Sequence, residues 1–139
     1  MLESEQTFHA AVPHIDEIKL LQKRAKSFLK RAEESLNSGD YDTAVFLAEQ
    51  AAQLHLKSVL LSEVGDYPRT RSISYLHQLL RKIPAQAELT RFLDSSKDEI
   101  RLLEDAYIAS RYLMREYSDE EAQSSITFAK KVLLYGALP

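Results

Sequence analysis

The stretch Gly39–Gly65, GDYDTAVFLAEQAAQLHLKSVLLSEVG, decides the fold of this chain. It has the spacing of one long helix, with a glycine at each end where a turn is expected. Nearly its whole circumference is apolar, which is typical of a helix buried among other helices. Three polar residues four apart, Glu49, Gln53 and Lys57, predict a narrow solvent-facing strip. We therefore expect this helix at the centre of a bundle.

A second face of this helix carries small side chains. The residues on it are alternately four and three positions apart: Ala44, Ala48, Ala51, His55, Ser58 and Ser62. Such a seam allows another helix to approach closely. The larger side chains around the rest of the helix need more than one neighbour to be buried. We expect a homodimer, formed through this small-residue face or through the adjoining surface of the helix expected at 85–112.

Composition indicates one all-α domain. The 139 residues include only three glycines and four prolines, and no run of alternating β-branched residues occurs. A chain of this length buries roughly 68% of its unfolded surface in a single core. We expect a flexible N-terminus over residues 1–13, ending at Pro13, and a single domain over residues 14–139.

Several function classes are disfavoured by what the sequence lacks. There is no cysteine, so disulfides and thiolate metal sites are excluded. The four histidines have no metal-site spacing, and no glycine-rich phosphate loop occurs, so we expect neither a metal nor a cofactor. A net charge of −3 gives no global attraction to nucleic acid. Without a signal-like N-terminus or a long apolar stretch, we expect a cytoplasmic protein and no membrane.

The rest of the chain predicts four more helices. Apolar residues at helical spacing place them at about 14–38, 72–83, 85–112 and 118–135. The short connection after the first of them predicts an antiparallel hairpin with the central helix. The fold expected from these elements is a four- to five-helix up-and-down bundle.

Local signals predict where these helices begin and end. Gly39 is suited to a left-handed cap, and the Asp40 side chain to an N-cap. Pro84 disfavours helical geometry in the residue before it and ends the short helix. Ser118 and Glu121 have the spacing of a capping box at the start of the last helix.

Three motifs occur in a specific order along the chain. S-G-D-Y-x-x-A-x-F-x-A-E-Q-A-A-x-x-x-L-K-x-x-L-L spans Ser38–Leu61, L-x-x-L-L spans Leu76–Leu80, and the long helix ends with A-S-R-Y at Ala109–Tyr112. Over about residues 20–136 the chain resembles the HEPN domain family. The resemblance implies a bundle that usually dimerises. It also implies a small prokaryotic protein often encoded beside, or fused to, a minimal nucleotidyltransferase, in many cases as a toxin–antitoxin pair.

Active members of that family resemble metal-independent endoribonucleases with an Arg-x(4–6)-His motif near the end of the long fourth helix. Arg111 stands at the arginine position, but the positions allowed for histidine hold Glu116, Tyr117 and Ser118. Cleavage of RNA by its 2′-hydroxyl needs a group that exchanges a proton near neutral pH, as histidine does. Tyrosine, with an ordinary pKa of about 10, is a poor substitute. We interpret the catalytic motif as degenerate, with Arg111 and Tyr117 as its candidate residues.

The same region can bind without cleaving. An arginine fork can hold a phosphate and a tyrosine can stack on a base, so the candidates for nucleotide or RNA binding are Arg111, Tyr112, Arg115 and Tyr117. The alternative is structural, with the arginine bonded to helix-end carbonyls and the tyrosines filling the end of the bundle. Arg71 and His77 also have five residues between them, but at the start of a short helix, so they are the weaker candidates.

Three functions remain open. The first is a nucleotide- or RNA-interacting subunit that pairs with a minimal nucleotidyltransferase. The second is an active endoribonuclease toxin. The third is a helical adaptor, because G-D-Y-x-x-A followed by alanines also occurs in tetratricopeptide repeats. An adaptor of that kind needs the motif again about 34 residues later, and it does not recur.

Overall fold

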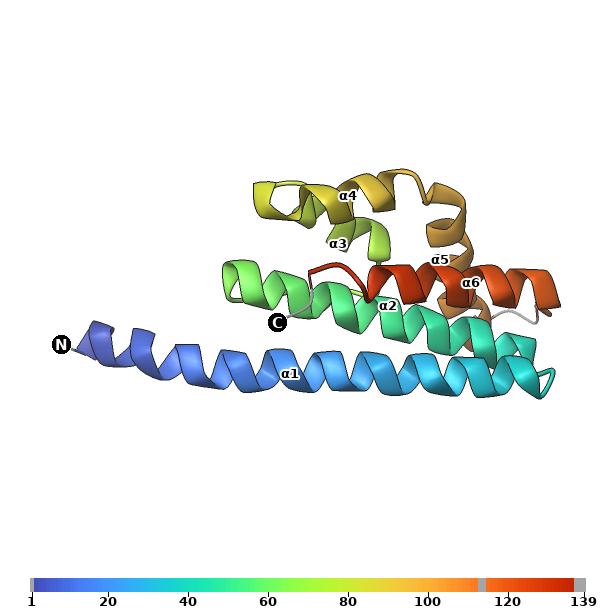
Figure 1. Cartoon of the computed structure of the whole chain (residues 1–139), viewed down its shortest axis with the longest axis horizontal. Helices are drawn as coiled ribbons and strands as arrows, with labels where there is room; N and C mark the ends of the chain where they lie inside the picture. Colours follow the sequence, from blue (N-terminus) through green and yellow to red (C-terminus); the bar gives the residue numbers. More distant parts are fainter. Residues whose placement is uncertain (1, 113–114, 137–139) are drawn as a thin grey trace.

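The computed structural model describes the backbone of residues 2–112 and 115–136 and the side chains of residues 14–108 and 115–136. Within these residues the chain is helical and contains no strand, which confirms the all-α class (Figure 1). No helix in the described part is both long and apolar enough to cross a membrane. The elements are α1 (Leu2–Asn37), α2 (Tyr41–Val64), α3 (Ile73–Leu80), the 3₁₀ helix η1 (Pro84–Gln86), α4 (Ala87–Asp94), α5 (Lys97–Tyr112) and α6 (Asp119–Val132).

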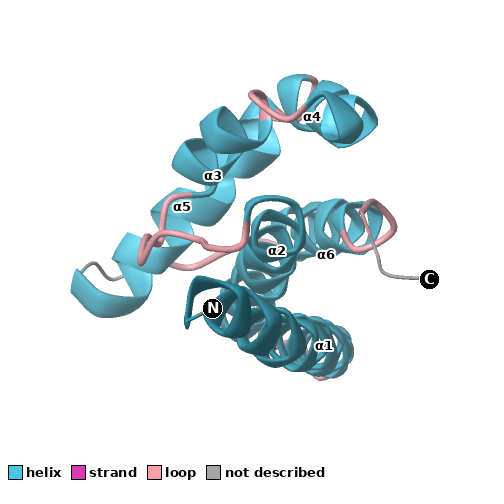
Figure 2. Ribbon diagram, turned by 90° about the vertical axis from the view of Figure 1, so that its left-hand side faces the viewer, coloured by secondary structure: helices cyan, strands magenta, loops and turns pink. Residues whose placement is uncertain are grey.

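The helices form two groups, and α2 belongs to the first and contacts the second. Helices α1, α2 and α6 lie side by side, and α3, α4 and α5 form a second group on one side of them (Figures 1 and 2). Helix α2 contacts α1, α6, α5 and α3. Its most completely buried residues have no exposed surface: Ala44, Val45, Ala48, Glu49, Ala51, Ala52, Leu56 and Ser58. The prediction that α2 is the central helix is confirmed.

The polar strip of α2 is not solvent-facing. Glu49 has 0% and Gln53 3% of its surface exposed, and Lys57 is half-buried. Helices α3 and α5 contact this helix, and the loop between α2 and α3 brings Tyr67 to within 5.9 Å of the Lys57 Nζ, measured to the ring centroid. The prediction of a wet strip is therefore wrong, because a second group of helices and its loop cover that side.

The small-residue face of α2 is filled by the chain itself. His55 Nε2 lies 2.6 Å from the carbonyl oxygen of Tyr135, beyond the end of α6. Gly136 has a positive φ of 64°, and a Cβ on it would lie 2.8 Å from Val59 Cγ2. The segment after α6 thus covers this face around His55, whereas Ser62 at the end of the face is exposed. The homodimer, through this face or through the adjoining surface of α5, stays a prediction.

The caps predicted at Gly39 and Ser118 are confirmed and the one at Asp40 is not, and α3 ends at Leu80 with Arg81 as its C-cap, before the limit expected from Pro84. Gly39 has a φ of 78°, as expected for a left-handed turn between α1 and α2. The Ser118 hydroxyl accepts from the Glu121 N–H and the Glu121 carboxylate accepts from the Ser118 N–H, which completes the capping box. Asp40 makes no side-chain cap hydrogen bond, so this prediction is wrong.

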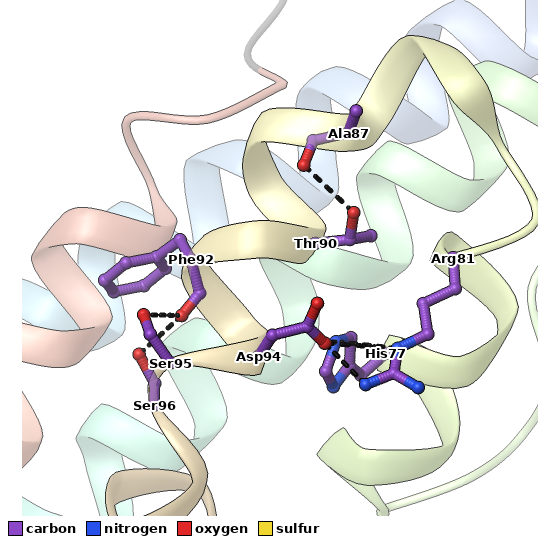
Figure 3. A network of polar contacts seen from close by, with 8 residues as sticks. All are labelled: His77, Arg81, Ala87, Thr90, Phe92, Asp94, Ser95 and Ser96. Carbon is purple, nitrogen blue, oxygen red and sulfur yellow. Dashed lines mark hydrogen bonds and ion pairs between the residues drawn. The ribbon is translucent and has the colours of Figure 1, made fainter.

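The helix expected at 85–112 is interrupted at Ser95 and Ser96, so six α-helices are described instead of four or five. The Ser96 N–H bonds to the carbonyl of Leu93, three residues back, at 3.0 Å. The carbonyl of Phe92 instead accepts from the hydroxyls of both serines, each at 2.8 Å (Figure 3). The carbonyl of Phe92 also accepts from the Ser95 N–H at 3.2 Å, so the backbone turns more tightly here and the Ser96 hydroxyl takes the place that the Ser96 N–H has in a continuous helix.

Helix α1 begins earlier than expected. It starts at Leu2 and not near His14, and Pro13, on which the expected boundary rested, lies inside it. The flexibility of residues 1–13 stays a prediction. At the other end of the chain, α6 stops at Val132, slightly before the expected limit of 135.

Candidate functional site

The end of α5 carries the residues expected to bind nucleotide or RNA. The backbone of Arg111 and Tyr112 forms the last turn of α5, but their side chains lie outside the described residues. Arg111 is four residues after Tyr107 and therefore lies on the same face of the helix. This face is the one on which the Tyr107 ring meets Arg71, whose guanidinium carbon lies 5.1 Å from the ring centroid.

The other two residues of this set lie in the connection between α5 and α6. The Arg115 guanidinium carbon lies 4.4 Å from the centroid of the Tyr117 ring, and its NH2 group lies 2.9 Å from Glu121 Oε2. The backbone N–H of Tyr117 donates to Asp42 Oδ1 at 2.8 Å, which anchors the connection to the first turn of α2. Arg115 and Tyr117 are thus brought together and already contact each other.

Tyr117 occupies one of the positions at which the ribonuclease motif needs a histidine. Only 7% of its surface is exposed, and its hydroxyl has no hydrogen-bond partner within the described residues. Burial raises the pKa of Tyr117 above its ordinary value; Arg115 acts against this, and the neighbouring carboxylates add to it. This phenol therefore does not exchange protons near neutral pH.

The weaker pair, Arg71 and His77, is not brought together. Arg71 lies over Tyr107, whereas His77 Nε2 lies 2.8 Å from Asp94 Oδ1 at the end of α4 (Figure 3). The ring of His77 also bonds to the backbone of Thr90. Burial lowers the pKa of His77 and repulsion from Arg81 adds to this effect, while Asp94 opposes it. His77 thus belongs to a polar contact between α3 and α4.

A buried carboxylate on α2 forms a polar cluster that the sequence reasoning missed. Glu49 accepts hydrogen bonds from Gln50 Nε2 at 2.6 Å and from Gln53 Nε2 at 2.7 Å. The Gln53 Oε1 in turn accepts from Lys57 Nζ at 2.9 Å. One feature of the sequence could have indicated that Glu49 is buried. The polar strip is only one residue wide, and the other faces of the helix need several neighbours, which leaves little room for solvent.

Burial raises the pKa of Glu49 to about 7, against the bonds from Gln53 and Gln50 and the charges of Arg71 and Lys57. Desolvation also lowers the pKa of Lys57, and the charge of Arg71 adds to this effect. Glu49 thus titrates in the range that RNA cleavage needs. It is nevertheless fully buried, so no substrate atom can reach its carboxyl group in this conformation.

The described surface offers grooves but no metal cluster. In the part of the chain with described side chains, no three His, Asp or Glu residues are placed to hold a metal ion. A groove of about 550 Å³ lies against α4, α5 and α6, beside the stacked rings of Phe92 and Phe128. A second groove, of about 390 Å³, lies between α3 and α5 and includes His77.

Comparison with known proteins identifies a matching family and a similar solved structure. The model of the HEPN domain matches residues 18–137, which include all the candidate residues described above. Among solved structures, the chain is similar to the crystal structure of the protein TT1696 from Thermus thermophilus. The TM-score is 0.67 and the identity 27%, over 86% of this chain and 94% of that chain. A search of the curated proteins found no match.

Proposed function

Because the chain belongs to the HEPN domain family, we propose that it is a nucleotide- or RNA-interacting subunit with a degenerate ribonuclease motif. In this proposal it pairs with a minimal nucleotidyltransferase, in the manner of a toxin–antitoxin pair. Both the partner and the ligand come from the family resemblance.

The observation that carries the proposal is the environment of Tyr117. The motif needs a proton-exchanging group five to seven residues after Arg111, and Tyr117 is buried there with a raised pKa. Its neighbours Glu116 and Ser118 are the other two residues at those positions. A buried phenol of raised pKa supplies neither the base nor the acid for attack by a 2′-hydroxyl near pH 7.

Glu49 and His77 do not replace the missing histidine. Glu49 is fully buried. His77 bonds to Asp94 and lines the groove beside Lys97 and Arg101, at the N-terminal half of α5, whereas Arg111 is in the last turn of that helix. These placements support binding over catalysis.

Binding would use the two ends of the α5–α6 connection. Arg111 and Tyr112 lie before it, and Arg115 and Tyr117 lie within it. Arg115 already bonds to Glu121 and covers one face of the Tyr117 ring, so a phosphate or base at these residues has to displace those contacts. We therefore assign the larger share of any binding to Arg111.

A cleavage assay tests the absence of ribonuclease activity. A single-stranded RNA oligonucleotide is incubated with the wild-type chain in a metal chelator, beside Arg111→Ala, His77→Ala and Tyr117→Phe. We expect no cutting above background in any sample. Metal-independent cutting that is lost in Arg111→Ala or His77→Ala would establish the endoribonuclease and overturn the proposal.

A binding assay tests the proposed interaction with nucleotide or RNA. Nucleotides and the same RNA should raise the thermal unfolding temperature of the wild-type chain, and less so that of Arg111→Ala. Arg91→Ala, an exposed arginine on α4, is the matched control. Co-expression with the minimal nucleotidyltransferase of the same genome should give a complex by size-exclusion chromatography. A protein partner without any nucleotide or RNA effect would favour the adaptor.

Light scattering tests the expected homodimer. The proposal predicts a particle of twice the chain mass of 15.9 kDa at tens of micromolar. A monomer under those conditions would contradict it.

A further inference from the structure

The groove between α3 and α5 has basic side chains at one end and acidic side chains at the other. It has a volume of about 390 Å³ and is lined by one face of each helix. Near the end of α3 lies Arg81, which bonds to Asp94, just before the start of α5. At the opposite end, Ser74 of α3 donates to Glu104 of α5 through its N–H at 3.0 Å and through its hydroxyl. The two helices therefore run in opposite directions along the groove.

One end of the groove is basic. Arg81, Lys97 and Arg101 line it, and Lys97 and Arg101 are four residues apart on the same face of α5. Neither of these two makes an ion pair or hydrogen bond with another described residue. Like charges at this spacing destabilise a helix slightly, so an anion between them would remove an unfavourable interaction. The local charges thus favour an anionic ligand.

The third cation at this end is held in place. Arg81 donates to Asp94 Oδ1 from Nε at 3.2 Å and from NH2 at 2.5 Å (Figure 3). Asp94 also contacts His77, which is 7% exposed. An arginine has five N–H donors, so those not used by Asp94 remain for a ligand. A side chain fixed in this way loses little conformational freedom on binding.

The other end of the groove is acidic. Glu104 accepts from Ser72 Oγ at 3.3 Å and from the N–H and hydroxyl of Ser74. Asp105, beside it, has no hydrogen bond or ion pair within the described residues. A carboxylate accepts hydrogen bonds and repels anions, so this end suits hydroxyl or amino donors. A ligand that fits the whole groove has a phosphate at one end and donors at the other.

We propose that this groove binds a small phosphate monoester that bears hydroxyl groups, such as a nucleoside monophosphate or a sugar phosphate. The phosphate lies between Arg81, Lys97 and Arg101, and the hydroxyl groups point toward Glu104 and Asp105. The volume is at the lower end of the range for small-molecule sites, which suits a ligand of this size. The site is separate from the Arg111 end of α5 and does not depend on the function proposed above.

Calorimetric titration at low salt tests the site with AMP, ribose 5-phosphate, adenosine and inorganic phosphate. We expect AMP or ribose 5-phosphate to bind at least tenfold more tightly than inorganic phosphate, and adenosine the most weakly. The relative affinity of the two esters distinguishes a nucleotide site from a sugar-phosphate site. Inorganic phosphate binding as tightly as both esters would overturn the proposal, because the acidic end would then contribute nothing.

The double variant Lys97→Gln/Arg101→Gln should weaken the better ester at least tenfold. The control is Lys19→Gln/Lys23→Gln, which removes two exposed charges at the same spacing from α1 and should leave binding within twofold. Asp105→Asn should weaken the ester and leave inorganic phosphate unchanged. Circular dichroism establishes that each variant is folded.

Arg111→Ala separates this site from the function proposed above. Ester binding at the groove should be unchanged in that variant. If ester binding is lost in Arg111→Ala and retained in Lys97→Gln/Arg101→Gln, the groove proposal is overturned while binding at the end of α5 stands.

Discussion

The two groups of helices share one apolar core but differ in the contacts that they add to it. In the group of α1, α2 and α6, small apolar residues are fully buried and bring the helices close together. In the group of α3, α4 and α5, polar contacts define the joints. The Phe92 carbonyl bonds to two serines, His77 and Arg81 bond to Asp94, and Ser74 bonds to Glu104. Hydrophobic periodicity thus specifies both groups, and individual hydrogen bonds additionally fix the joints of the second.

Helix α2 joins the two groups and has a different face toward each. Ala48, Ala51 and Ser58 are fully buried on its small-residue face, and His55 of that face contacts the segment after α6. Its polar strip carries Glu49, which interacts electrostatically with Arg71 in the loop before α3. Helix α2 therefore shares the apolar core with both groups and adds a polar contact to the loop before α3.

The largest expected effect comes from breaking the apolar contact. Leu56 on α2 has no exposed surface, so Leu56→Ala should lower the free energy of unfolding by about 2–5 kcal/mol through lost transfer energy and a cavity. Urea denaturation measures the change. Leu20→Ala is the control, because Leu20 is 43% exposed and should cost about 1 kcal/mol or less. Equal losses from both substitutions would contradict the assignment of α2 as the central helix.

The second-largest expected effect comes from changing the polar strip of α2. The folded chain holds the Glu49 proton with a pKa of about 7, above the ordinary value of 4.5. The stabilisation from this group is therefore complete below pH 4.5 and is lost as the pH rises to about 7. The total is roughly 3 kcal/mol, from about 1.4 kcal/mol per pKa unit. Glu49→Gln removes this titration, so the stability of the wild type relative to the variant should fall by up to that amount.

Urea denaturation of both proteins at several pH values between 4 and 8 measures this difference. Glu63→Gln removes a glutamate from an exposed position on the same helix and is the matched control for loss of one charge. A pH profile that Glu49→Gln and Glu63→Gln change equally would show that burial of Glu49 does not govern it.

The sequence predicts the first group of helices well and the second less well. The apolar repeat of α2, the left-handed Gly39 and the capping box of Ser118 and Glu121 are each decided within a few residues along the chain. The break at Ser95 and Ser96 was not predicted, because a serine can bond to a carbonyl three or four residues back without interrupting its helix, as Ser58 does in α2 and Ser125 in α6. A continuous helix and an interrupted one differ little in free energy at such a serine, so the packing of neighbouring helices decides which forms.

The candidate site shows the same limit. The motif placed Arg115 and Tyr117 in one segment, and the structure brings them into contact. The sequence could not show that Arg71 and His77 have different partners, because these partners, Tyr107 and Asp94, are distant along the chain. Nor could it show that Glu49 is buried, because helical periodicity does not state how many neighbours a helix has.

The smallest expected effect comes from a substitution at the joint between α4 and α5. Ser96 is 5% exposed and donates to the carbonyl of Phe92 at 2.8 Å, so Ser96→Ala leaves that acceptor with one hydroxyl fewer. We expect a loss of about 1 kcal/mol in the free energy of unfolding. Ser95→Ala, at an exposed serine that bonds to the same carbonyl, should cost less than about 0.5 kcal/mol. Hydrogen exchange should become faster at the start of α5 in Ser96→Ala alone. An unchanged exchange rate would show that backbone bonds hold this joint without help from the buried hydroxyl.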